Sequence, residues 1–112
     1  MTTSTTWQPV CQLDDILPGT GVCALVEGRH IAIFRVGDSD CYALDNIDPK
    51  SGASVLSRGL VGNLGDHLVV ASPLYKQHFD LRSGACLEIP EQSLRSYPVR
   101  CDGGQILLQL AA

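Results

Sequence analysis

No apolar segment of this 112-residue chain continues for more than a few residues before a turn signal interrupts it. Short runs rich in β-branched residues alternate from end to end with Gly, Asp and Ser. Many short strands at close spacing are typical of an antiparallel sandwich or barrel. The strands that we expect are residues 7–11, 22–26, 30–36, 41–45, 68–72, 78–81, 97–101 and 105–110.

The turn signals support the same all-β class. Gly within the segments 27–28 and 102–104 predicts hairpin turns, because Gly adopts a positive φ without steric cost. Helix is expected to be scarce. Residues 51–60 could hold one or two turns, and residues 88–96 hold at most one turn because Pro90 interrupts them. No internal repeat is apparent.

The length is usual for one domain, and 45% hydrophobic residues are enough to build a core. A net charge of −4 gives no electrostatic reason to bind nucleic acid. The first residues lack the basic and apolar regions of a secretory signal, and no apolar run approaches the roughly 20 residues of a membrane span. We therefore expect a cytoplasmic domain at 7–112 behind a flexible tail at 1–6, with no membrane partner.

Five cysteines are scattered along the chain without any pair at zinc-site spacing. Most lie inside apolar stretches, which predicts free, buried thiols in a reducing compartment. Redox chemistry at one of them is the alternative. They are Cys11, Cys23, Cys41, Cys86 and Cys101.

Two segments resemble the ligand loops of Rieske ferredoxins. The segment 42–54 reads YALDNIDPKSGAS, where the family typically has Y-A-I/L-D-x-x-C-x-H-x-G-A. The segment 72–84 reads SPLYKQHFDLRSG, where the family has C-P-x-H-x-x-x-F-D-x-x-S/T-G. The resemblance implies a Rieske-like antiparallel sandwich or barrel with a small loop subdomain at about 42–84.

All four ligand positions of that family pattern carry other residues. Asp48 and Lys50 replace Cys and His in the first loop, and Ser72 and Tyr75 replace them in the second. A Rieske [2Fe–2S] centre needs two thiolates on one iron and two imidazoles on the other. Hard oxygen groups and a protonated amine are poorly matched to it. We therefore expect that the chain binds no cluster, no metal and no other cofactor.

A ligand-free domain that keeps both loop frames resembles the small subunit of the assimilatory NAD(P)H-dependent nitrite reductase. The segments 51–59 and 72–79 carry this resemblance. It implies a large partner subunit that holds FAD, a [4Fe–4S] cluster and sirohaem and reduces nitrite to ammonia. It also implies that this chain is a companion subunit with no catalytic residues of its own.

The residues of the two loops can be interpreted either as ordinary surface or space-filling side chains or as contacts to a partner. Asp48 and Lys50 are either an exposed, solvated charge pair or a polar contact to the large subunit. Tyr75 either closes the space that a cluster would fill or anchors an interface. Our candidate partner interface is the set of loop-tip residues Asp48, Pro49, Lys50, Tyr75, Lys76 and Gln77.

The remaining polar residues give weaker signals. His30, His67 and His78 lie far apart in the sequence, so they predict strand-edge or surface roles rather than a metal site. Ser72 lacks the Gly-x-Ser-x-Gly frame of a hydrolase nucleophile, and no Gly-rich phosphate loop follows a strand. An alternative to the nitrite reductase subunit is a free-standing Rieske-fold module that docks to another oxidoreductase. A true electron carrier is disfavoured by the four missing ligands.

Overall fold

The computed structural model describes residues 7–110, which form three antiparallel sheets. The first has the order β1–β10–β9, the second β2–β3–β4–β8 and the third β5–β6–β7. The strands are β1 (Gln8–Gln12), β2 (Thr20–Val26), β3 (Arg29–Val36), β4 (Asp40–Asp45), β5 (Leu60–Leu64), β6 (His67–Ala71), β7 (His78–Asp80), β8 (Ser96–Tyr97), β9 (Val99–Asp102) and β10 (Gln105–Leu108). The all-β, antiparallel prediction is confirmed.

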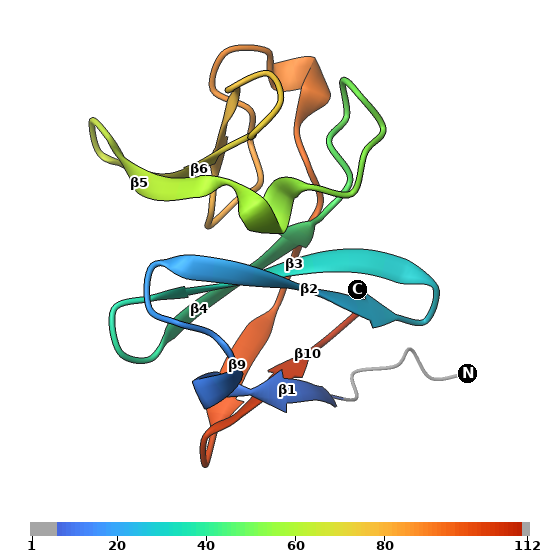
Figure 1. Ribbon diagram of the computed structural model, residues 1–112, viewed down its shortest axis with the longest axis vertical. Helices are drawn as coiled ribbons and strands as arrows, with labels where there is room; N and C mark the ends of the chain where they lie inside the picture. Colours follow the sequence, from blue (N-terminus) through green and yellow to red (C-terminus); the bar gives the residue numbers. More distant parts are fainter. Residues whose placement is uncertain (1–6, 111–112) are drawn as a thin grey trace.

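The sheet β2–β3–β4–β8 is the middle layer of the molecule (Figure 1). Side chains alternate across a strand, so β3 serves two cores at once. Ile31 and Ile33 pack towards β1, β9 and β10, whereas Ala32 and Phe34 pack towards β5, β6 and β7. All four are fully buried. The continuous apolar run in β3 therefore reflects burial on both faces of the sheet.

The part of the molecule that contains the sheet β5–β6–β7 and the two loops is called the smaller lobe. One strand of this sheet, β5, was not predicted from the sequence. β5 contains Gly62 and Asn63, which weaken its strand pattern, but it pairs with β6 over its whole length. Gly59, directly before β5, lies close to the backbone of β6: a Cβ at this position would lie 2.3 Å from the carbonyl oxygen of Ala71. The lobe also extends past residue 84, since Cys86 and Leu94 pack in the same core as Phe79. The division into tail, domain and loop subdomain stays a prediction, and residues 1–6 lie outside the described part.

Helical structure within residues 7–110 is limited to the three-residue 3-10 turns η1 (Leu13–Asp15), η2 (Leu56–Arg58) and η3 (Pro90–Gln92). The expected helical turns at 51–60 and 88–96 are thus present only as η2 and η3. No helix in this part of the chain is long and apolar enough to cross a membrane. The predicted hairpin turns join β2 to β3 and β9 to β10, where Gly28, Gly103 and Gly104 have positive φ.

The two loops that resemble ligand loops lie in the smaller lobe, away from the sheet β1–β10–β9 (Figure 1). The first follows β4 and the second joins β6 to β7. Their bases are fixed by short pairings, such as the bridge between Ile47 and Ser54. The fold therefore presents both loop tips at one end of the molecule.

Candidate functional site

The first loop is an Asp-capped turn built on Asp48. Its Oδ1 atom accepts hydrogen bonds from the backbone N–H groups of Lys50 at 2.8 Å and Ser51 at 3.4 Å. The backbone closes around it, because Gly52 N donates to the Asp48 carbonyl oxygen and Asp48 N donates to the Ala53 carbonyl oxygen. Asp favours such turns because its short side chain bonds to the backbone two residues on. Asp48 thus builds the loop itself.

The same turn occurs a second time at Asp80. Asp80 Oδ1 accepts from the N–H groups of Arg82 and Ser83, Gly84 N donates to Asp80 O, and Asp80 N donates to Ala85 O. The two sequences are DPKSGA at 48–53 and DLRSGA at 80–85. The expectation of no internal repeat was therefore wrong at this length. The shared D-x-basic-S-G-A hexapeptide was the available signal.

The second loop turns back on itself between Ser72 and Gln77. Ser72 N donates to the Gln77 carbonyl oxygen at 2.8 Å, and Lys76 N donates to the Ser72 carbonyl oxygen at 2.9 Å. The Ser72 hydroxyl also accepts from Leu74 N at 3.3 Å. These bonds hold Leu74, Tyr75 and Lys76 outward at the tip, where all three are exposed.

The four replaced ligand positions pair with each other across the two loops. Ser72 Oγ donates to Asp48 Oδ2 at 2.6 Å, and both side chains are buried. Lys50 Nζ lies 4.6 Å from the centroid of the Tyr75 ring, within cation–π range. The two Cys-equivalent positions thus form one pair and the two His-equivalent positions form the other. We call Asp48–Ser72 and Lys50–Tyr75 together the cross-loop pairs.

The residues at these positions do not fit a [2Fe–2S] cluster. A Rieske cluster takes thiolate and imidazole ligands, whereas these four side chains offer a carboxylate, a hydroxyl, an ammonium and a phenol. The buried carboxylate and hydroxyl are also committed to each other by a direct hydrogen bond. Direct side-chain contacts therefore occupy the place between the loops where the family pattern puts the ligands.

Two members of the candidate interface are buried, which corrects the sequence-based expectation for them. Asp48 is fully buried, so it is not half of an exposed charge pair. Gln77 is 6% exposed, and its Nε2 donates to Gln92 Oε1 at 2.5 Å in η3. Hydrogen bonds offset the burial of Asp48, whereas Gln77 Oε1 is buried without a partner among residues 7–110, which is unfavourable. The exposed tip comprises Pro49, Lys50, Tyr75 and Lys76.

Asn46 is a site residue that the sequence analysis missed. It is fully buried at the base of the first loop, where Nδ2 donates to Ser54 Oγ at 2.7 Å and Oδ1 accepts from Ser57 N at 2.6 Å. Its two bonds connect the loop to η2. A buried Asn inside a polar loop carries no pattern that distinguishes it from an exposed one.

The three histidines do not converge on one site. His67 Nδ1 lies 2.8 Å from Asp80 Oδ2, His78 Nδ1 lies 2.6 Å from Glu88 Oε2, and His30 Nδ1 lies 2.8 Å from Ser54 Oγ. Among residues 7–110 no three His, Cys, Asp or Glu side chains are placed to hold a metal ion.

Contacts with two of these histidines help to lower the pKa values of two carboxyl groups. Burial by itself raises the pKa of Asp80, but the hydrogen bond from His67 and those from the backbone N–H groups of the turn outweigh it, so the pKa is lowered. For Glu88, burial likewise raises the pKa, and the backbone N–H and the ring of His78 overcome it and lower the pKa. Both contacts stabilise the ionised carboxylates of the smaller lobe.

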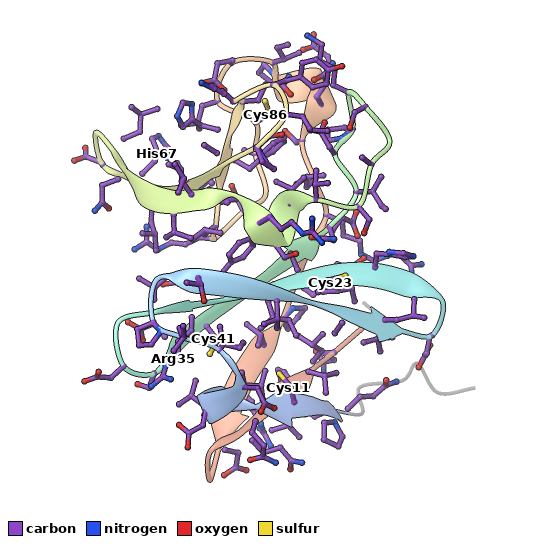
Figure 2. All side chains as sticks on the ribbon, viewed as in Figure 1. Cys11, Cys23, Arg35, Cys41, His67 and Cys86 are labelled. Atoms are coloured by element: carbon purple, nitrogen blue, oxygen red, sulfur yellow. The ribbon has the colours of Figure 1, made fainter. Side chains whose placement is uncertain are left out.

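All five cysteines are free thiols, as expected. Cys11 and Cys41 pack against the same core, between the sheet β1–β10–β9 and the middle sheet (Figure 2). Cys86 is buried in the smaller lobe, but Cys23 is exposed on β2, contrary to the expectation of buried thiols. Burial raises the pKa of Cys11 and of Cys41, which makes both poor nucleophiles. The described thiols lie outside the two loops.

Comparison with known proteins gives consistent matches over nearly the whole chain. Residues 6–109 match the family model of the Rieske-like [2Fe–2S] domain. The nitrite reductase (NADH) small subunit of Salmonella typhimurium is 51% identical over 104 residues, which cover 92% of this chain and 96% of that protein. The solution structure of the NAD(P)H nitrite reductase small subunit from Erwinia carotovora has a TM-score of 0.84 at 51% identity, covering 97% of this chain and 85% of that one.

A further match lies inside a longer polypeptide. The NAD(P)H nitrite reductase large subunit of Klebsiella oxytoca is 47% identical over 100 residues. The match covers 89% of this chain but 10% of that protein. That protein thus contains a stretch similar to most of this chain.

Proposed function

The chain belongs to the Rieske-like [2Fe–2S] domain family, and from this membership we propose that it is the small subunit of an NAD(P)H-dependent nitrite reductase. The enzyme would reduce nitrite to ammonia in nitrate assimilation in the cytoplasm. The small subunits of such enzymes are its relatives over nearly their full length, at 51% identity in Salmonella typhimurium. The stretch within the Klebsiella oxytoca large subunit supports a partner of that kind, because there a similar domain is part of the same polypeptide.

The cross-loop pairs are the observation that carries the proposed division of labour. Asp48 bonds to Ser72, and Lys50 stacks on Tyr75, so no ligand set for a [2Fe–2S] cluster is available between the loops. We infer that this subunit transfers no electrons through a cluster of its own. FAD, a [4Fe–4S] cluster and sirohaem would all belong to the large subunit, which would carry out the chemistry.

The exposed loop tip is the proposed contact with the large subunit. Tyr75 is 49% exposed, and Lys50 Nζ lies 4.6 Å from the centroid of its ring. An exposed aromatic side chain with a cationic neighbour suits the centre of a modest interface. Asp48 and Gln77 belong to the same two loops, but both are buried and so lie outside this exposed surface.

The test is nitrite-dependent NAD(P)H oxidation by the purified large subunit, with and without this chain. We expect the two chains to form a complex and the rate or the lifetime of the activity to rise when this chain is added. The absence of both a complex and any change in activity would contradict the proposal. A complex with a different oxidoreductase would then favour a free-standing docking module.

A further inference from the structure

The outer face of the sheet β5–β6–β7 is buried at the neighbouring pair Val69 and Asp80 but is open along one row of residues beside that pair. Val70 and Phe79 are neighbours across β6 and β7, and both are fully buried in the core of the lobe. The adjacent row of the sheet, which joins Leu60, Ala71 and His78, must therefore lie on the opposite face. Leu60 is 80% exposed there.

This face is hollowed at two adjoining places. One hollow of about 440 Å³ is lined by Arg58, Leu60, Ala71, Ser72, Pro73, Lys76 and His78. The second, of about 230 Å³, lies along β5 and shares Leu60, Ala71 and His78 with the first. Gly62 contributes to the second hollow, because a Cβ at this position would meet no atom within 4 Å. We call the combined hollow the β5 groove.

Two unpaired cations lie at one end of the β5 groove, whereas His78 in the same lining contacts the carboxylate of Glu88. Arg58 and Lys76 are exposed, and neither side chain makes a hydrogen bond or an ion pair within the described part of the chain. Among residues 7–110, no Asp or Glu lines either hollow. An apolar groove with free cations at one end is complementary to an apolar side chain beside a carboxylate.

The strand beside the groove also has an open edge. β5 pairs only with β6, and the backbone of residues 60–64 makes no other hydrogen bond among residues 7–110. The strand contains no charged residue and no Pro, which are the usual protections of a free edge. An extended segment can add to such an edge through its main chain.

We propose that the β5 groove binds an extended, acidic segment of the large subunit, which lies along β5. Its carboxylate contacts Arg58 and Lys76, and its apolar side chain packs against Leu60. The inference rests on the proposed function, and it extends the loop-tip interface, since Lys76 belongs to both surfaces. The large subunit would then contact the smaller lobe along a surface that runs from the loop tips to the β5 edge.

The experiment measures the affinity of the purified large subunit for variants of the full chain. Leu60→Ser removes the apolar contact, and Arg58→Glu reverses the charge, while both leave the loop tips intact. We expect each to weaken binding at least about tenfold, and the loss from Arg58→Glu to shrink as salt is raised. Arg58→Lys, which keeps the charge, should stay within about threefold of wild type.

Matched controls lie on the other sheets. Leu25→Ser changes a leucine of β2 that is 71% exposed, and Arg100→Glu reverses a charge on β9. Both should bind like wild type, and circular dichroism should show that all variants fold. If wild type binds and Leu60→Ser and Arg58→Glu bind like the controls, the groove inference is wrong and the proposed function stands. If wild type does not bind, the proposed function itself fails.

Discussion

Asp48 uses its two carboxylate oxygens for different tasks. Oδ1 caps the turn of the first loop, and Oδ2 accepts the hydroxyl of Ser72 from the second loop. Burying a carboxylate is costly unless hydrogen bonds replace its water. Three bonds do so here. One side chain therefore shapes one loop and ties it to the other.

We predict that Ser72→Ala lowers the free energy of unfolding by about 1–3 kcal/mol, because it leaves a buried carboxylate oxygen without its donor. The matched control is Ser83→Ala, which removes an exposed hydroxyl that accepts a hydrogen bond from Ala85 N. This variant should lose little stability. Urea denaturation of the three proteins measures the difference. A cost for Ser72→Ala no larger than that of the control would contradict the role given to the Asp48–Ser72 bond.

The second Asp-capped turn gives a pH prediction. The pKa of Asp80 is lowered in the folded chain, so its ionised form stabilises the fold above the unfolded pKa of about 3.9. This contribution is lost as the pH falls through the lower, folded pKa. The stability difference between wild type and Asp80→Asn should therefore be constant near neutral pH and narrow below about pH 4.

Denaturation midpoints measured at a series of pH values test this, with Asp66→Asn as the control for an exposed carboxyl group. A gap between wild type and Asp80→Asn that stays constant down to about pH 2 would show that the contacts with His67 and the turn do not favour the ionised form.

For single residues, the sequence pattern gave candidate positions but did not reveal what surrounds them. The family pattern singled out Asp48, Lys50, Ser72 and Tyr75, and the structure brings them together in pairs. The burial of Asp48 depends on a partner 24 residues away, which no local pattern reveals. The repeated hexapeptide, in contrast, could have indicated that Asp48 caps a turn.

Among the elements, β3 and β5 show what a strand pattern can and cannot predict. β3 was predicted because its apolar run is continuous, and burial on both faces explains that run. β5 was missed because Gly62 and Asn63 break the alternation and its outer face stays exposed. Pairing with β6 through a short hairpin, rather than intrinsic preference, makes β5 a strand.

Gly84 allows a test of how the turn at Asp80 packs against Leu94. Its φ is +82°, and a Cβ would lie 2.1 Å from the carbonyl oxygen of Leu94. We predict that Gly84→Ala lowers the free energy of unfolding by more than about 2 kcal/mol, through backbone strain and displacement of the segment around Leu94.

The control is Gly62→Ala, where a Cβ meets open space at an ordinary φ and the change should be neutral or stabilising by about 0.5–1 kcal/mol. Thermal unfolding followed by circular dichroism compares the two variants. Equal stability of both variants would show that the Asp80 turn is not held against Leu94 as the structure shows.

Residues 7–110 form a three-layered β domain with the two loops at one end (Figure 1). Two cores share the middle sheet, so changes at the loop tips should leave the fold intact. The overall class followed from strand and turn spacing together with the loop motifs. The exposed face of the sheet β5–β6–β7 could not be predicted. The exposure of Leu60 depends on which face of this sheet packs on the core, and the sequence does not show that.

The loop tip should contribute to assembly as a unit. We predict that Lys50→Glu combined with Tyr75→Ala weakens binding to the large subunit at least about tenfold, because it removes the aromatic anchor and its cation. Lys50→Arg combined with Tyr75→Phe keeps the cation–π contact and should bind like wild type. Calorimetric titration distinguishes them. Equal affinity of the two folded double variants would place the interface elsewhere.

The central claim is that the cross-loop pairs replace a [2Fe–2S] cluster, and iron and acid-labile sulfide analysis tests it most directly. The purified chain would be incubated with iron and sulfide under reducing, anaerobic conditions, beside a Rieske ferredoxin stripped of its cluster as the positive control. The account predicts a colourless protein with no iron or sulfide above background, while the ferredoxin regains its cluster. Stoichiometric iron and sulfide in this chain, with the visible absorbance of a Rieske centre, would contradict it.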